Sequence, residues 1–143
     1  MKKVLAFAIV CLLLLSFASA ESVSAICTKW NSLGSHYSSV QLSEDIATEK
    51  DGMIYFTGDS WKVIFADDQV GIYAEDFQTL MCNAATAGLM AVGDASGFRE
   101  YLGNIAYQYL AVISGETPLM LMYGSYTFNI APVDKGYMLL LKK

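Results

Sequence analysis

The stretch MIYFTGDSWKVIFADDQVGIYAE, residues 53–75, decides the fold class of this 143-residue chain. It contains three short apolar runs, 53–57, 61–66 and 70–75, separated by the turn-forming sequences GDS and DDQ. In the middle run Trp61, Val63 and Phe65 fall on one side and the residues between them on the other. Because the side chains of a strand point alternately to its two faces, the stretch predicts a three-stranded antiparallel meander with one apolar face.

Downstream of this meander the spacing of apolar residues changes from two to three or four. The change predicts two helices between residues 76 and 114, interrupted at Gly93-Asp94, with Asp94 or Ser96 as the cap of the second helix. Residues 87–92 are apolar enough to form a strand instead, and the periodicity of so short a run does not distinguish a helix from a strand. The second helix has a broad apolar face that another element must cover, formed by Phe98, Tyr101, Leu102, Ile105, Tyr109 and Val112.

The C-terminal region returns to strand patterns, at residues 118–123, 126–130 and 137–141. Residues 119–122 and 138–141 are apolar at every position, so we expect both runs to be central in a sheet or covered. Lys142 and Lys143 then end the last strand in water and discourage edge pairing.

Upstream of the first meander, apolar residues recur every three or four positions from Val23 to Tyr37 and predict a helix over residues 22–34. The polar residues 35–50 predict a loop. The full order is helix, three strands, two helices, three strands, which predicts an α+β fold. We expect an antiparallel sheet of about five to six strands with helices packed on one face, a two-layer sandwich.

The first twenty residues have the three parts of a secretory signal: Lys2 and Lys3, an apolar run over residues 4–15, and the small residues Ala18-Ser19-Ala20. We therefore predict cleavage after Ala20, a single domain over residues 21–143, and a secreted or periplasmic location. The alternative is that the segment stays uncleaved and anchors the protein in a membrane.

The charge of the chain limits its partners. Acidic residues number 14 against 9 basic residues, and cleavage removes only Lys2 and Lys3. Net negative charge disfavours binding to nucleic acid and to anionic membrane surfaces. We expect no nucleic acid partner and, after cleavage, no membrane partner.

Two cysteines, Cys27 and Cys82, remain after cleavage. In an oxidising compartment they can form a disulfide. The alternative is that both are small, buried, apolar residues in neighbouring helices.

Catalytic and metal-binding motifs do not stand out in this sequence, so we predict no catalytic residue, no metal site and no cofactor. His36 is the only histidine, and a single imidazole cannot build a multi-histidine metal site; we expect a solvated loop residue. The acidic pairs Asp67-Asp68 and Glu75-Asp76 are the alternative, since converging carboxylates can serve a hydrolase-like enzyme.

The expected function is that of an exported, non-enzymatic domain that binds a partner protein or a small apolar ligand; a homodimer is compatible with this expectation. Tyr107 is the candidate recognition residue, because it projects from the polar side of its helix. The alternatives are an exported hydrolase-like enzyme and, if the signal stays uncleaved, an envelope-tethered structural subunit.

Two families offer fold analogies. The tail from Pro118 to Leu141 resembles the paired strands that end roadblock-like domains, which are small scaffolding modules. Leu89 to Asp94 is similar to the strand ending in Gly-Asp that precedes a helix in sterol-carrier-like domains. Each implies a fold expectation only, because one fold hosts many functions.

Overall fold

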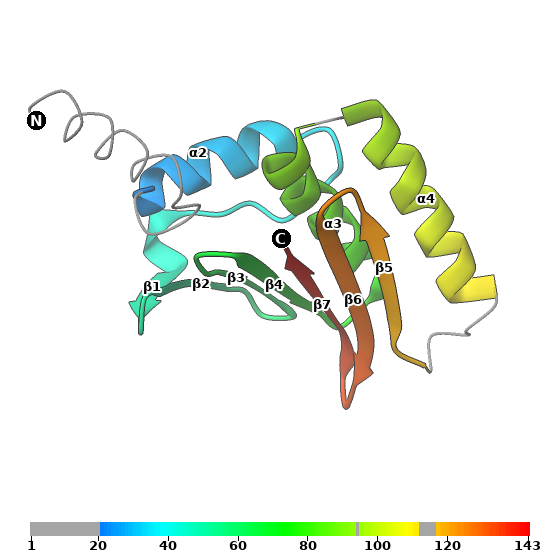
Figure 1. Cartoon of the computed structure of the whole chain (residues 1–143). Coiled ribbons are helices and arrows are strands. Elements are labelled where there is room, and N and C mark those ends of the chain that lie inside the picture. The colour runs from blue at the N-terminus through cyan, green and yellow to red at the C-terminus, as the bar shows by residue number, and fades with distance from the viewer. Residues whose placement is uncertain (1–20, 94, 112–116) are drawn as a thin grey trace, which may run out of the picture.

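Helices and strands follow each other in the predicted order in the computed structural model, which describes residues 21–93, 95–111 and 117–143 (Figure 1). The α+β class is therefore confirmed. The predicted signal segment, Asp94 and Val112 lie outside the described residues. The elements are α2 (Val23–Gly34), η1 (Glu44–Ile46), β1 (Ala47–Lys50), β2 (Met53–Thr57), β3 (Trp61–Phe65), β4 (Gln69–Ala74), α3 (Phe77–Val92), α4 (Ala95–Ala111), β5 (Leu119–Tyr123), β6 (Tyr126–Val133) and β7 (Gly136–Lys142).

The strands form one antiparallel, seven-stranded sheet in the order β1-β2-β3-β4-β7-β6-β5. The additional strand is β1, which lies in the stretch predicted as a loop. It is a polar edge strand that pairs with β2, from Ala47 opposite Phe56 to Lys50 opposite Met53. Asp51 and Gly52 join the two strands with φ values of 54° and 75°, the left-handed conformation that two-residue hairpin turns use.

The two meanders become one sheet where β4 pairs with β7, from Gln69 opposite Lys142 to Ala74 opposite Tyr137. This pairing puts β7 in the interior of the sheet and leaves β5 as an edge. The expectation that residues 119–122 are central is therefore wrong, and the strand is covered on one face only: Leu119 and Leu121 pack against the core, whereas Met120 and Met122 are exposed. The expected role of Lys142 at a sheet edge is wrong for the same reason.

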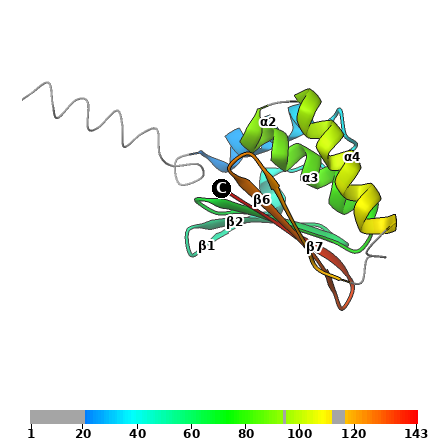
Figure 2. The same ribbon diagram turned by 45° about the vertical axis from the view of Figure 1, so that its right-hand side comes forward.

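The three helices lie on one face of the sheet (Figure 2). In this layer α3 packs on β4 and β7 and also against both α2 and α4, while α4 packs on β5. The strands send every second side chain into the space below the helices, where Phe56, Val63 and Phe128 are fully buried. Aromatic rings fill this core in edge-on and stacked pairs, such as Trp30 with Phe65 and Phe77 with Tyr109.

The helical hairpin of α3 and α4 is tightly joined. Gly93 ends α3 in the left-handed conformation, with φ 74°, so residues 87–92 are helical and not a strand. The resemblance to sterol-carrier-like domains required a strand before Gly93, and this segment is a helix, so that resemblance is wrong. Gly88 brings the two helices together, because a Cβ there would overlap the ring of Phe98.

The apolar face predicted for α4 is confirmed by the burial of Phe98, Leu102, Ile105 and Tyr109. Tyr101 on the same helix donates its hydroxyl to the backbone carbonyl of Met122 in the edge strand, at 2.5 Å. From the sheet side, the Tyr126 hydroxyl donates to the carbonyl of Ala91 in α3, at 2.8 Å. Both bonds tie the C-terminal strands to the helical layer.

Candidate functional site

The face of the sheet that points away from the helices, which we call the outer face, is covered by none of the described helices (Figure 2). Alternate residues of each strand point to this face, and the register aligns them in rows across the sheet. The central row is Thr48, Tyr55, Ile64, Gly71, Leu140, Asn129 and Met120. The rows on either side of it are Thr57, Lys62, Tyr73, Met138 and Ala131, and Gln69, Lys142, Thr127 and Met122.

Exposed apolar side chains gather on the outer face. Among the described residues, five large apolar side chains are exposed, and four of them belong to β5, β6 and β7 on this side. Their exposed fractions are 67% for Met120, 65% for Met122, 49% for Met138 and 38% for Val133. Methionine side chains are flexible and polarisable and adapt to many partner surfaces, so this grouping is typical of a contact surface.

A shallow notch lies in the middle of the central row. Gly71 has no side chain there, and a Cβ at this position would meet only Ile64, at 3.8 Å. The glycine is therefore not required by crowding inside the fold. A glycine in a strand interior often marks a place where another chain or ligand approaches the backbone closely.

The charged residues of the outer face lie away from its centre. No carboxylate projects from the three rows defined above; Lys62 and Lys142 lie in the flanking rows, and Lys50 lies on the same face in the edge strand β1. Lys142 contacts Asp68 of the β3–β4 turn at 3.8 Å, with both side chains more than half exposed. An uncharged apolar centre with a charged periphery is the usual anatomy of a protein–protein interface.

A second surface feature is a pocket of about 230 Å³ beside the end of α2, lined by seven residues of α2 and the loop that follows it. Its lining is polar: Asn31, Ser35, Ser38, Ser39 and Gln41, with Gly34 and Val40. The Asn31 amide is engaged in the fold, because it donates to the Leu42 carbonyl at 2.8 Å and accepts from the Leu42 N–H at 2.9 Å. The pocket therefore lacks the apolar lining that a small apolar ligand would need.

The same segment is anchored to α3 by Asn83, which sequence reasoning missed. This fully buried side chain accepts a hydrogen bond from the Val40 N–H at 3.0 Å, while its Nδ2 has no partner. Nearby, the Thr86 hydroxyl donates to Ser39 at 3.1 Å. The signal was present, since Asn83 and Thr86 interrupt an otherwise apolar helix, and buried polar groups of this kind need backbone partners.

The two cysteines predicted as a potential disulfide, Cys27 and Cys82, are free thiols. Cys27 is buried in α2 and Cys82 half-buried in α3, as the alternative prediction described. Burial raises the pKa of both thiols, and the carboxylates of Glu44 and Asp76 add to the effect at Cys27 and Cys82 respectively. A raised pKa lowers the thiolate fraction, so neither side chain has the properties of an activated nucleophile.

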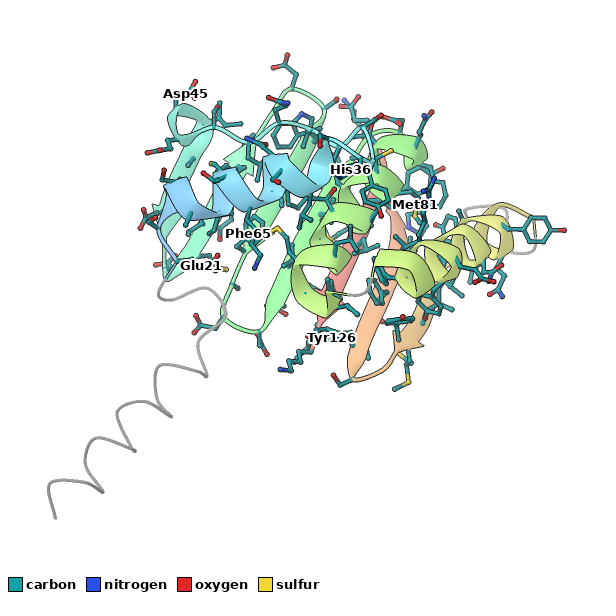
Figure 3. All side chains as sticks on the ribbon, turned by 90° about the horizontal axis from the view of Figure 1, so that it is seen from above. Glu21, His36, Asp45, Phe65, Met81 and Tyr126 are labelled. Carbon is teal, nitrogen blue, oxygen red and sulfur yellow. The ribbon has the colours of Figure 1, made fainter. Side chains whose placement is uncertain are left out.

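His36 and Tyr107 are both exposed to solvent. His36 follows α2, where its backbone N–H donates to the Leu33 carbonyl at 3.2 Å, and Figure 3 shows it just past the end of that helix. Its predicted position in a solvated loop is confirmed. Tyr107 is 73% exposed on α4, as its place on the polar side of the helix predicted. It lies in the helical layer and is not part of the outer face.

The acidic pairs do not converge. Asp67 and Asp68 precede β4, and Glu75 and Asp76 follow it, so the six-residue strand holds the pairs roughly 20 Å apart. Asp76 serves the fold, because its carboxylate accepts a hydrogen bond from the Thr79 N–H at 2.7 Å and caps α3. The described residues contain no group of three or more His, Cys, Asp or Glu side chains that could hold a metal ion.

Within the described residues, no helix has both the length and the apolar character needed to cross a membrane. Comparison of the chain with protein-family models, with curated proteins and with solved structures gives no match.

Proposed function

We propose that this protein is an exported, non-enzymatic binding domain whose outer sheet face contacts a partner protein. The observation that carries the proposal is the contrast in exposure within one sheet: large apolar side chains are buried on the helical side and exposed on the other. Several large exposed apolar side chains on one face, with charged residues around them, are more often an interaction site than an accident of folding.

A small apolar ligand receives less support as the partner. Among the described residues, large side chains occupy the space between the helices and the sheet, including Trp30, Phe56 and Phe98, each at most 1% exposed. The pocket beside α2 has polar walls. Sites for apolar ligands are usually concave and mostly apolar, whereas the exposed apolar side chains here lie on a broad sheet face.

An acid-based enzyme also receives less support. Glycosidase-type chemistry needs two carboxyl groups within roughly 10 Å of each other on either side of a substrate. Here β4 separates the two acidic pairs, and the Asp76 carboxylate is occupied as a helix cap. The proposal therefore rests on surface recognition.

Photo-crosslinking in the organism that exports the protein tests the proposal directly. A photoreactive amino acid replaces Met120 on the outer face in one variant and Tyr107 on α4 in a matched variant, since both side chains are exposed. We expect a covalent adduct of defined mass from position 120. Adding Met138→Glu should remove that adduct, because a carboxylate would have to be buried in the contact.

Two results would overturn the proposal. One is the absence of an adduct from position 120 when the protein is present at its natural level. The other is an adduct from position 107 that Met138→Glu leaves unchanged, which would place recognition on α4.

A further inference from the structure

We propose that the partner of the outer face is a second copy of this chain, packed face to face about a two-fold axis. The resulting dimer has four layers: helices, sheet, sheet, helices. This inference rests on the proposed function, because it names the occupant of the same face. Three properties of the face carry it: its charge, its size and its shape.

The charge of the molecule is divided unequally between the outer face with the turns of the sheet and the rest of the described residues. Three lysines, Lys50, Lys62 and Lys142, occupy strand positions of the outer face. Five aspartates lie in the turns at the ends of the strands, together with Lys135 and the terminal Lys143, so the two signs balance over the outer face and the turns: Asp51, Asp59, Asp67, Asp68 and Asp134. The other described residues are strongly acidic, with Glu21, Glu44, Asp45, Glu49, Glu75, Asp76 and Glu100 against Lys29 and Arg99. Two acidic molecules repel each other, and the repulsion is smaller when they approach through the outer face of the sheet, where lysines and the aspartates of the turns balance, than through the acidic helical layer.

Both signs of charge occur at each end of the strands, so the face can oppose itself. The end with the β3–β4 turn has Asp68 in contact with Lys142. At the opposite end, Asp134 and Lys135 share the β6–β7 turn. Lys62 in a flanking row can extend its ammonium group to the rim while its methylene groups stay in the contact.

The size of the face suits a stable dimer. A seven-stranded sheet is roughly 30 Å wide, and strands of about five residues are roughly 17 Å long. Two such faces have a combined area of about 1,000 Å² in projection, and more once the relief of the side chains is included. Specific protein–protein interfaces begin at about this total buried area. A second sheet of the same dimensions matches this broad surface, as in two-sheet sandwiches with layers about 10 Å apart.

The relief of the face is complementary to itself. A two-fold interface uses the same patch on both molecules, so each projection needs a depression within that patch. Gly71 of β4 provides the depression in the central row. Met138 lies in the neighbouring strand β7 and in the next row, and its side chain projects with 49% of its surface exposed. A two-fold axis between these positions places each Met138 over the Gly71 of the other copy.

Sedimentation equilibrium of the exported protein, from about 1 μM to about 1 mM, measures the association. We expect a concentration-dependent change from monomer to dimer and no larger species. Met138→Glu should weaken the dimer by more than about tenfold, because two carboxylates would be desolvated in one interface. Tyr107→Glu places the same charge on the helical side and should leave the dissociation constant unchanged.

Cysteine crosslinking tests the orientation. Asn129→Cys introduces a thiol in the central row and Asn104→Cys introduces one on the exposed side of α4, so the two variants differ only in the face they probe. We expect a short bis-maleimide to join two copies through Cys at position 129 and not at position 104, above the background from Cys27 and Cys82.

The outcomes separate this inference from the proposed function. A monomer at every concentration, with no crosslink through position 129, overturns the second copy as partner. If photo-crosslinking at Met120 then still gives an adduct of a different mass, the face binds another protein and the proposed function survives. Loss of both signals overturns both. A dimer that crosslinks through position 104 places the interface on the helices and overturns the face-to-face arrangement.

Discussion

The two faces of the sheet differ in environment, and strand β7, which is apolar on both faces along residues 138–141, shows this most directly. Leu139 and Leu141 point to the helices and are 1% and 2% exposed. On the other face Leu140 is only half-buried and Met138 is 49% exposed. Apolar character in a strand therefore identifies residues that can be buried, and the arrangement of the whole chain decides which of them are.

The difference has a physical origin in what each face contacts. On the inner face, rings and branched chains from strands and helices interdigitate, as between Phe98 and Phe128, whose centroids are 5.5 Å apart. No described helix covers the outer face, where side chains contact turns of the sheet, as Lys142 does with Asp68 and the Tyr73 hydroxyl with the Lys135 carbonyl. The inner face supplies the stability of the fold, and the outer face leaves apolar side chains exposed.

The largest expected effect compares Leu139→Ala with Leu140→Ala, the same substitution at adjacent residues of β7. Removing the Leu139 side chain leaves a cavity in the core and should lower the free energy of unfolding by about 2–5 kcal/mol. Leu140→Ala should cost less than about 1 kcal/mol, because the site is already partly solvated.

Urea unfolding of both variants measures this contrast. The measurement belongs at a protein concentration low enough that association makes no contribution. Equal losses for the two variants would mean that the outer face is as well packed as the core, and the contrast between the faces would fail.

A second pair of substitutions compares the inside and the outside of the helical hairpin. Gly88→Ala inserts a methyl group where the Phe98 ring lies, and we expect a loss of about 1–3 kcal/mol from overpacking. Gly103→Ala lies in open space on α4 and should raise the free energy of unfolding by up to about 1 kcal/mol, since alanine favours the helix. If both thermal and urea unfolding show that Gly88→Ala lowers the free energy of unfolding and Gly103→Ala raises it, the close approach of α3 and α4 is confirmed. A stabilising Gly88→Ala would contradict it.

Local patterns in the sequence were sufficient for most elements. Strand β2 has the bounds that its apolar run predicted, and the alternation of Trp61, Val63 and Phe65 in β3 placed all three on the inner face. Asp51-Gly52, a strong hairpin signal, could also have revealed β1. That strand was missed because its sequence, ATEK, is polar and has no apolar alternation.

The arrangement of the two meanders did not follow from local patterns. Leu119 to Met122 looked central because every residue is apolar, yet β5 is the edge. The reason is the pairing of β4 with β7, which joins residues more than sixty positions apart, such as Gln69 and Lys142, through contacts that no local spacing encodes. The outer face was unpredictable for the same reason, because it is assembled from both meanders.

Among the candidate site residues, only the exposure of Tyr107 and His36 was predictable from helix periodicity and loop composition.

The smallest expected effect concerns the start of α3, where the chain passes from the sheet to the helical layer. Hydrogen bonds from Thr79, first from its side chain and then from its backbone N–H, lower the pKa of Asp76. A carboxyl group with a lowered pKa in the folded state stabilises the fold above its unfolded pKa, near 3.9, and loses this contribution as the pH falls through the folded pKa.

Asp76→Ala should therefore cost about 1 kcal/mol at neutral pH, and the difference from the unmodified protein should shrink below about pH 4. Asp76→Asn keeps a capping oxygen without the charge, so urea unfolding should give it most of the stability at neutral pH and no pH dependence from this site. If Asp76→Ala unfolds like the unmodified protein at neutral pH, the cap contributes nothing, and packing on the inner face alone holds α3 to the sheet.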